Sequence, residues 1–469
     1  MTRPDRVHAF TDDALADHDA VGIADLIRRG EVSREEIEQA AIARLEKVAP
    51  ALAATAYTAY DAPRRSSDTG APLYGVPTLI KDNTDVAGWP TNHGSEAFVA
   101  KPAAKDGHYA AQYLDSGMTV LGKSRMPEFG LNASTEFRTG PPTLNPWHTD
   151  YSVGASSGGA AALVAAGALP IAHANDGGGS IRIPAAAAGL VGLKPSRGRH
   201  RDGEEARIMP INIISEGVVS RSVRDTAAFV EAMERSWRNP KLAPIGRVEG
   251  PARRKLRIGI LLESVTDAVV DPQTRAAVEH TARLLEEQGH VVEPVPVPAD
   301  QRFADDFVTY WGLLAELAGG LGKLAFDRSF DTAKLDGLTD GLRHDFLGGG
   351  WRRLPGALVR LRRAARTYAA AFDRHEVVLS PVVANVTPKL GHLSPNVPYD
   401  VLMDRLRKHV AFTPVQNITG TPAISLPMAL SDEGLPIGVM LSAAYGDDRT
   451  LIELAYGLEE QNPWPRIQG

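Results

Sequence analysis

The feature that most constrains this 469-residue chain is a long stretch, Val153–Ser196, that is almost devoid of charge and dense in glycine, alanine and serine. Side chains this small let backbone segments pass close to one another. A low-complexity linker would have a similar composition, but it would lack apolar residues in buried strand and helix patterns, such as Leu163, Ile171 and Leu193. The stretch is therefore predicted to be a folded, buried segment.

Elements of α/β type flank this stretch on both sides. Segments Ala20–Arg29 and Ser33–Val48 have apolar residues at helical spacing, and Ser33 with Glu36 is typical of a capping box. The apolar run Tyr74–Ile80 predicts a buried strand that ends at Lys81. After Arg221, strands and helices alternate to the end of the chain. This alternation predicts an α/β fold around a central sheet.

The composition excludes several classes of function. The net charge of −6 argues against nucleic acid as a partner, because a phosphate-binding face needs a basic excess. The one basic concentration, Arg352–Arg366, has arginine at near-helical spacing and is interpreted as a solvated helix face. The absence of cysteine excludes disulfides, thiolate metal sites and cysteine-nucleophile hydrolases.

No segment has the pattern of a membrane or export signal. Met1–Phe10 lacks the apolar core of a signal peptide. The longest apolar stretch, Ala160–Ala172, is interrupted by Gly167 and Pro170 and is shorter than the roughly 20 residues that span a bilayer. We therefore expect a cytoplasmic protein without a membrane partner.

Two motifs imitate well-known sites. Gly117–Ser124 fits the phosphate-loop pattern GxxxxGK[ST], but its variable positions, Met118–Leu121, read as a strand whose N–H groups are used by a sheet. Gly154–Gly158 fits GxSxG, the nucleophile elbow of α/β-hydrolases, which would make Ser156 the nucleophile of an esterase. An elbow needs a hydrophobic strand before it, and the preceding residues are loop-like.

A third motif, Asp176–Pro184, places three glycines directly before Ser180. Such a turn has several unblocked N–H groups that can converge on one oxygen and hold a developing oxyanion. Asp176 and Arg182 bracket the serine and can pair to fix the turn. Taken alone, the motif favours a plain glycine turn with a surface serine.

The second and third motifs form one block, because Ser156 and Ser180 are 24 residues apart. The block resembles the amidase-signature family, in which a GxSSGG element precedes a GGSxRxP element at this separation. The residues that fit are Gly154, Ser156, Ser157, Gly158, Gly159, Asp176, Gly178, Gly179, Ser180, Arg182 and Pro184.

The resemblance extends along nearly the whole chain. The family has a lysine on an upstream strand in a GVPxxxKD setting, and Lys81 occupies that position. Further agreement lies in segments 91–95, 122–124, 128–129, 412–422 and 434–438. Agreement is strong over Tyr74–Ser196 and at the C-terminus, and weak over Pro240–Arg374, where family members usually differ in their substrate pocket.

The resemblance implies one amidase-signature domain over residues 1–469, with a central mixed β-sheet flanked by helices on both faces. Its catalytic core is expected at about 70–225, a variable pocket region at about 240–374 and a return to the core at 375–469. Gly177 departs from many members, which carry a larger residue there. The Asn175–Ser180 variant resembles the branch with aminohexanoate cyclic-dimer hydrolases and aryl- or alkyl-amide amidases.

A Ser–cis-Ser–Lys triad of Lys81, Ser156 and Ser180 follows from the resemblance. Ser180 is the expected nucleophile, Ser156 passes its proton to Lys81, and a cis peptide bond is expected at Ala155–Ser156. A lysine serves as a base only when neutral, and burial favours the neutral amine. His173 is the only histidine inside the block and matches no catalytic position of the family.

The surrounding roles are also carried over from the family. The N–H groups of Gly177, Gly178, Gly179 and Ser180 are expected to form the oxyanion hole. Ser157 is expected to orient Lys81, and Asp176 and Arg182 to support the turn. Substrate contacts are expected from Leu131, Asn132 and Ala133. The chemistry needs no metal and no cofactor.

Together these features predict an amide hydrolase for small aryl or alkyl amides, with esters and carbamates as further substrates. Two alternatives stay open: an amidotransferase subunit that uses ammonia on an aminoacyl-tRNA with a partner chain, and the esterase with Ser156 as nucleophile. The sequence does not name the physiological substrate or the oligomeric state, a homodimer included.

Overall fold

The computed structural model describes residues 6–266, 268–297 and 302–468. Its largest element is a mixed eight-stranded sheet in the order β4-β6-β5-β10-β11-β9-β7-β8. Only the β7 pairings with β8 and β9 are parallel. The strands are β4 (Ile171–Asp176), β5 (Val191–Lys194), β6 (Ser215–Ser220), β7 (Arg257–Ile260), β8 (Val291–Pro294), β9 (Val377–Pro381), β10 (Ala423–Leu430) and β11 (Pro436–Ala443).

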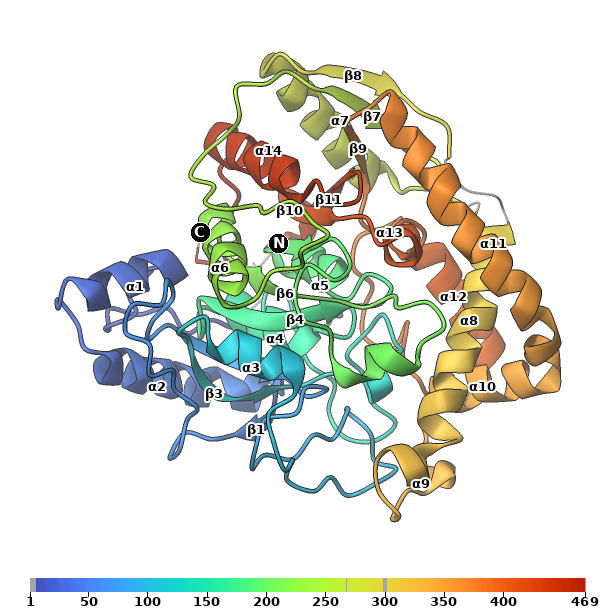
Figure 1. The fold of residues 1–469 in the computed structure, drawn as a ribbon, viewed down its shortest axis with the longest axis horizontal. Coiled ribbons are helices and arrows are strands. Elements are labelled where there is room, and N and C mark those ends of the chain that lie inside the picture. Colours follow the sequence, from blue (N-terminus) through green and yellow to red (C-terminus); the bar gives the residue numbers. More distant parts are fainter. Residues whose placement is uncertain (1–5, 267, 298–301, 469) are drawn as a thin grey trace.

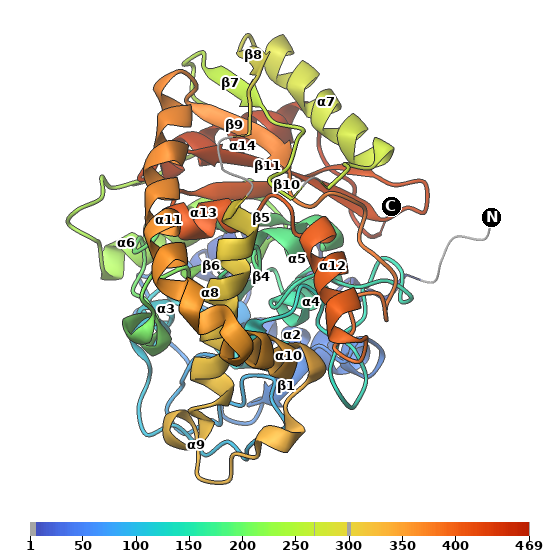
Figure 2. The same ribbon diagram turned by 90° about the vertical axis from the view of Figure 1, so that its right-hand side faces the viewer.

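Helices pack on both sides of this sheet, which confirms the predicted α/β class (Figures 1 and 2). The helices packed on its strands are α4 (Gly158–Ala165), α5 (Arg182–Ala188), α6 (Val223–Ser236), α7 (Pro272–Glu287) and α14 (Asp448–Gln461). Every residue of α4 and α5 is buried. The charge-poor stretch therefore lies in the interior, as its composition predicted.

A second sheet of three strands carries Lys81, so the strand that ends in the lysine is not part of the large sheet. β2 (Pro77–Lys81) pairs in parallel with β3 (Thr119–Ser124), and β1 (Thr55–Thr58) pairs with β3 antiparallel. β3 confirms that the phosphate-loop pattern is a strand. Thr78 Oγ1 donates to the carbonyl of Ile171 at 3.0 Å, which ties β2 to the edge strand β4.

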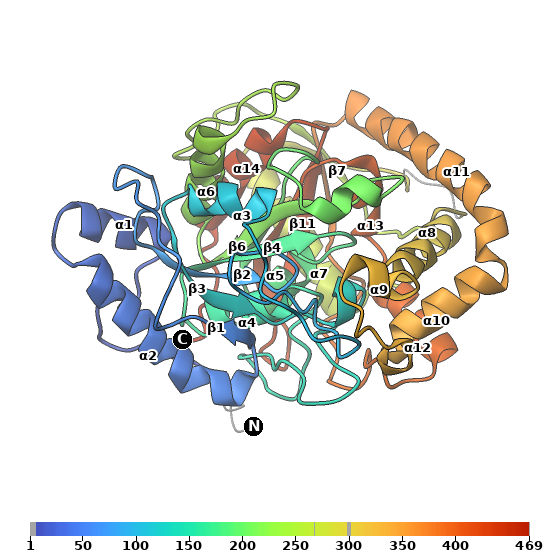
Figure 3. The same ribbon diagram turned by 60° about the horizontal axis from the view of Figure 1, so that its bottom comes forward.

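The N-terminal helices follow the predicted pattern and lie at one end of the molecule (Figures 1 and 3). α1 spans Ala20–Arg28 and α2 spans Arg34–Leu52. Ser33 and Glu36 form the expected capping box. α2 continues four residues beyond Val48, through a turn that contains Pro50. α3 (His108–Leu114) lies nearer the sheet. Within the described residues, no helix combines the length and apolarity needed to cross a membrane.

A group of helices stands at the opposite end of the molecule (Figures 1 and 3). The group contains α8 (Arg302–Gly319), α9 (Gly322–Ala325), α10 (Gly337–Asp345), α11 (Trp351–Ala369), α12 (Tyr399–His409) and α13 (Pro414–Thr419). In α11, Arg352, Arg362 and Arg366 are exposed, which confirms the predicted solvated face. Segment 240–254 forms neither helix nor strand. Short helical turns lie at 128–130, 204–208, 332–334, 346–350 and 370–373.

Candidate active site

Lys81 ends β2 with a side chain that is fully buried. Its Nζ lies 2.7 Å from Ser156 Oγ, 3.1 Å from Ser157 Oγ and 2.6 Å from Asn175 Oδ1. The structure thus brings the predicted lysine and the first serine of the block together, with Ser157 beside them. Asn175 joins this group without having been predicted to.

The partners of Lys81 determine which of them supplies a proton. Asn175 Oδ1 is an acceptor only, and Ser157 Oγ already donates to the carbonyl of Asn175 at 3.3 Å. A neutral amine has two N–H groups and one lone pair. Asn175 Oδ1 and Ser157 Oγ accept these two N–H groups, so the lone pair is left to accept the hydroxyl proton of Ser156. The geometry therefore fits a Ser156 hydroxyl that donates to a neutral Lys81.

Burial favours this neutral form. Desolvation lowers the pKa of Lys81 from 10.5 to about 7, although the charges of Glu216, Asp176 and Glu205 act to raise it. A base with a pKa near the operating pH is the efficient choice for proton transfer.

Ser180 is buried, with 8% of its surface exposed. The backbone N–H of Ser156 donates to Ser180 Oγ at 3.3 Å. Among the described residues, no hydrogen bond joins the two serine hydroxyls directly, so the proton transfer requires the Ser180 hydroxyl to turn toward Ser156 Oγ.

The expectation of a cis bond at Ala155–Ser156 is wrong for this structure, because no cis peptide bond occurs among its described residues. With a trans bond, the hydroxyl of Ser156 still reaches Lys81 and its N–H still reaches Ser180. These contacts do not depend on the less stable isomer.

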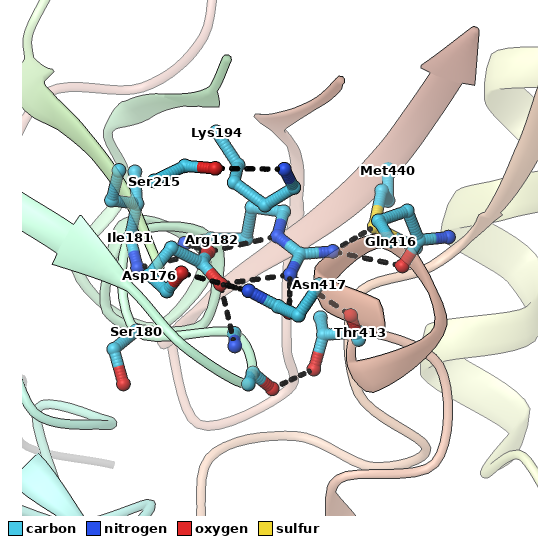
Figure 4. A network of polar contacts seen from close by, with 12 residues as sticks. Asp176, Ser180, Ile181, Arg182, Lys194, Ser215, Thr413, Gln416, Asn417 and Met440 are labelled. Carbon is cyan, nitrogen blue, oxygen red and sulfur yellow. Dashed lines mark hydrogen bonds and ion pairs between the residues drawn. The ribbon is translucent and has the colours of Figure 1, made fainter. Parts of the chain in front are cut away.

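A buried ion pair supports the turn before Ser180 (Figure 4). Arg182 Nε and Nη2 each donate to Asp176 at 2.9 Å, and both side chains are fully buried. Arg182 also donates to Gln416 Oε1 at 3.0 Å and to Asn417 Oδ1 at 2.7 Å. Burial alone would raise the pKa of Asp176, but Arg182 holds it well below its usual range. The predicted pairing is therefore confirmed, and the C-terminal segment completes it.

The three glycines before Ser180 are not equivalent. Gly179 N–H donates to Asp176 Oδ1 at 2.7 Å, so the prediction that it also serves the oxyanion does not fit this geometry. The carbonyl of Gly178 accepts from Thr413 Oγ1 at 2.6 Å. Within the described part of the chain, the N–H groups of Gly177, Gly178 and Ser180 have no partner.

A cavity of about 560 Å³ opens above Ser180 and Lys81. Leu131, Asn132 and Ala133, predicted to contact the substrate, all line it. Asn132 Nδ2 donates to the carbonyl of Leu393 at 2.8 Å, whereas its buried Oδ1 has no partner among the described residues. The remaining walls come mainly from α8, α12 and the segment around 209–214.

One wall of the cavity is aromatic. Phe98, Phe129 and Phe326 line it, and Phe326 stacks on Phe98 at 5.0 Å and on Phe129 at 5.3 Å between ring centroids. His93 contacts Phe326 at 5.0 Å. His93 and Phe129 both have left-handed backbone, with φ of +53° and +48°. Strained backbone of this kind clusters at ligand sites.

Comparison with known proteins identifies the family of this chain. The model of the Amidase family matches residues 31–452. The chain belongs to the amidase family. It is 53% identical to a putative amidase AmiC of Mycobacterium leprae (strain TN), over 99% of each chain.

Two solved structures resemble this amidase closely. A 6-aminohexanoate cyclic dimer hydrolase superposes with a TM-score of 0.87 and 29% identity, covering 98% of this chain and all of the other. A bacterial aryl acylamidase of the amidase-signature family superposes with a TM-score of 0.81 and 25% identity, covering 96% of this chain and 97% of the other. Both resemblances confirm the amidase-signature fold.

The elbow interpretation of Ser156 does not fit the amidase. No strand precedes residues 154–158, since 145–157 contains only isolated bridges and turns. The histidine of the block, His173, contacts the backbone N–H of Lys81 at 3.0 Å and not a serine.

Sequence reasoning missed three buried residues of this site: His173, Asn175 and Glu216. Glu216 accepts from His173 Nε2 at 2.9 Å and from Asn175 Nδ2 at 3.4 Å. His173 and Asn175 are two residues apart on a strand, a spacing that puts them on one face and was readable from the sequence. Glu216 had no such signal.

Proposed function

We propose that this amidase hydrolyses carboxylic amides through an acyl-enzyme on Ser180, with Ser156 and Lys81 as the proton relay. The observation that carries the proposal is the contact of 2.7 Å between Ser156 Oγ and a buried Lys81 whose other two partners are acceptors. That arrangement leaves the amine one role toward Ser156, which is to accept its proton.

In the acylation step, Ser180 Oγ bonds to the carbonyl carbon while its proton passes to Ser156 and the proton of Ser156 passes to Lys81. The tetrahedral intermediate then collapses, the carbon–nitrogen bond breaks and the proton returns through Ser156 to the leaving amine. Water repeats the sequence on the ester and releases the carboxylate. Each hydroxyl is regenerated, so the cycle balances.

The N–H groups of Gly177, Gly178 and Ser180 are the proposed oxyanion donors. Asp176 supports this role indirectly, because its carboxylate holds Gly179 N–H and Ile181 N–H on the inner side of the turn. Loss of one oxyanion donor lowers the rate by about 10²–10³.

The cavity favours small aryl or alkyl amides. The aromatic wall of Phe98, Phe129 and Phe326 provides a stacking surface for an aryl group and an apolar surface for an alkyl group. The two solved relatives carry the names of a cyclic-dimer hydrolase and an aryl acylamidase, which fits this size range.

The test is hydrolysis of a panel of p-nitroanilides, p-nitrophenyl esters, urethanes and primary amides. Ser180→Ala is expected to abolish turnover and Lys81→Ala to remove most of it, while Ser156→Ala impairs it. Full activity in Ser180→Ala would refute the acyl-enzyme, and an unchanged rate in Ser156→Ala would refute the relay. The thermal midpoint of each variant checks that it is folded.

A further inference from the structure

A closed ring of hydrogen bonds starts and ends on Lys81. Its Nζ donates to Asn175 Oδ1 at 2.6 Å, and Asn175 Nδ2 donates to Glu216 Oε1 at 3.4 Å. Glu216 Oε2 lies 2.9 Å from His173 Nε2, and His173 Nδ1 accepts from the backbone N–H of Lys81 at 3.0 Å. All four residues are at most 6% exposed.

The positions of the hydrogen atoms in this ring follow from which groups can only donate and which can only accept. A backbone N–H can only donate, so His173 Nδ1 carries no hydrogen and its Nε2 does. Burial lowers the pKa of His173 well below its usual value, and a charged Lys81 lowers it further, so the imidazole of His173 stays neutral. Glu216 therefore receives an N–H at each oxygen, and neither partner can accept a carboxyl proton. Burial raises the pKa of Glu216 to about 8, whereas the hydrogen bond from Asn175 and the charge of Lys81 act to lower it. The two N–H groups that point at its oxygens therefore favour the ionised form of Glu216 against the effect of burial.

We propose that Glu216, fixed by His173 and linked to Lys81 through Asn175, is a positioning residue that orients the Lys81 amine and sets how readily it takes a proton. The inference rests on the proposed function, in which Lys81 becomes an ammonium during acylation. A carboxylate one side chain away then stabilises that charge, and the Asn175 bridge keeps the amine lone pair on Ser156.

The register of the sheet supports this role. Asn175 and Glu216 are directly opposite in the antiparallel pair β4–β6, so their side chains leave the sheet on the same face. The strand β2 delivers Lys81 to that face. A glutamate that served only to fill the sheet would not need a neutral histidine and an amide, each aimed at one of its oxygens.

Other titratable groups also face the ring. They are Tyr109 from α3, Asp176 at the end of β4, and Asp202, Glu204 and Glu205 near the turn at 204–208. Burial raises the pKa of Tyr109 well above its usual value, so it stays neutral, and Arg182 keeps Asp176 ionised throughout. Burial raises the pKa of Glu205 to about 8, so this residue needs its own control.

The experiment measures the rate at which a fluorophosphonate probe labels Ser180 between pH 5 and pH 10, which needs no knowledge of the substrate. In Glu216→Gln the acidic limb of the profile is expected to move to lower pH by about one unit, because a favourable charge near the amine is lost. In Asn175→Asp the limb is expected to move to higher pH by about one unit or more, because a carboxylate then touches the amine.

Controls separate this role from general structural damage. Asp225→Asn removes a buried carboxylate that accepts two backbone N–H groups outside the ring, and it is expected to leave the limb in place. Glu205→Gln is expected to shift the limb less than Glu216→Gln, since no hydrogen bond joins Glu205 to Asn175 within the described chain.

An unmoved limb in Glu216→Gln, or equal shifts in Glu205→Gln and Glu216→Gln, would overturn the positioning role. If Glu216→Gln does not fold, an unmoved limb in Asn175→Asp overturns it instead. Wild-type protein that is not labelled on Ser180 would overturn the proposed function itself, which distinguishes the two failures.

Discussion

Replacing Lys81 with methionine tests the central physical claim, that the protein holds a lysine in a site that disfavours its charge. Methionine has a similar length and no titratable group. The pKa of Lys81 is about 7 in the folded protein and 10.5 in an ordinary environment. Between these values the unfolded chain binds a proton that the folded chain does not, so stability rises with pH in this window.

The magnitude follows from the two pKa values. From pH 7 to pH 9, the unfolded lysine stays almost fully protonated, whereas the folded lysine goes from half protonated to nearly neutral. The wild type therefore gains about 2 kcal/mol of stability relative to Lys81→Met across this range. With an unfolding entropy of about 2.1 cal/mol/K per residue, the corresponding shift in thermal midpoint is about 2 °C.

The assay is scanning calorimetry of both proteins at pH 7, 8 and 9, together with anilide turnover. Lys194→Met is the matched control. Lys194 is also buried with its pKa lowered to about 7 by desolvation, but it donates to Pro195 O and Ser215 Oγ, outside the relay. Both variants are expected to flatten the pH dependence of the midpoint, and only Lys81→Met to remove most of the turnover. Parallel midpoints for wild type and Lys81→Met would refute the claim of a neutral buried amine.

Three further outcomes are expected. Asp176→Asn leaves the buried Arg182 uncompensated and lowers stability by about 3–5 kcal/mol in thermal unfolding. Because the pKa of Asp176 is depressed in the folded protein, the difference in stability between the wild type and Asp176→Asn is present above about pH 4 and is lost as the pH falls through the folded pKa. A difference in stability that stays constant down to pH 2 would contradict this prediction. Phe326→Ala raises KM for anilides by roughly tenfold with little change in kcat, but leaves a short aliphatic amide unaffected; equal effects on both substrates would exclude an aryl contact. Gly177→Ala is expected to keep the fold, since its Cβ would lie 3.8 Å from Ile214. Gly179→Ala is expected to disrupt the turn, because Gly179 has φ of +132° and its Cβ would lie 2.4 Å from Thr413. A lower thermal midpoint in calorimetry for Gly177→Ala than for Gly179→Ala would refute this difference between the two glycines.

The sequence was sufficient to predict the site residues that lie close together in the chain. Ser156, Ser180, Asp176 and Arg182 lie within one block, and the resemblance of that block to the amidase-signature family implied that they lie close together. Lys81 was identified through the resemblance to the family, which has a lysine in a GVPxxxKD setting, and the apolar run before it predicted that its strand is buried. The buried character of the charge-poor stretch followed from composition in the same way.

Contacts that depend on strand register or on packing between distant segments could not be predicted from the sequence. Glu216 reaches the site only because β6 pairs with β4 in one particular register. Phe98 and Phe326 are far apart in the sequence and stack only because α8 and α9 return over the cavity. The sequence also offered no way to see which glycine N–H the carboxylate of Asp176 would occupy.

The strand β4 shows how these local and distant relations combine. Side chains alternate across a strand, so Asn175 and Asp176 point to opposite faces. Asn175 faces Lys81 and Glu216, on the side of the proposed proton relay, and Asp176 faces Arg182, on the side that holds the turn before Ser180. A shift of one residue in the register of β4 would exchange the two faces and remove both functions at once. The pairing of β4 with β6 therefore matters to the site as much as the serines do. Consecutive residues of one strand position both the proposed base and the proposed oxyanion turn.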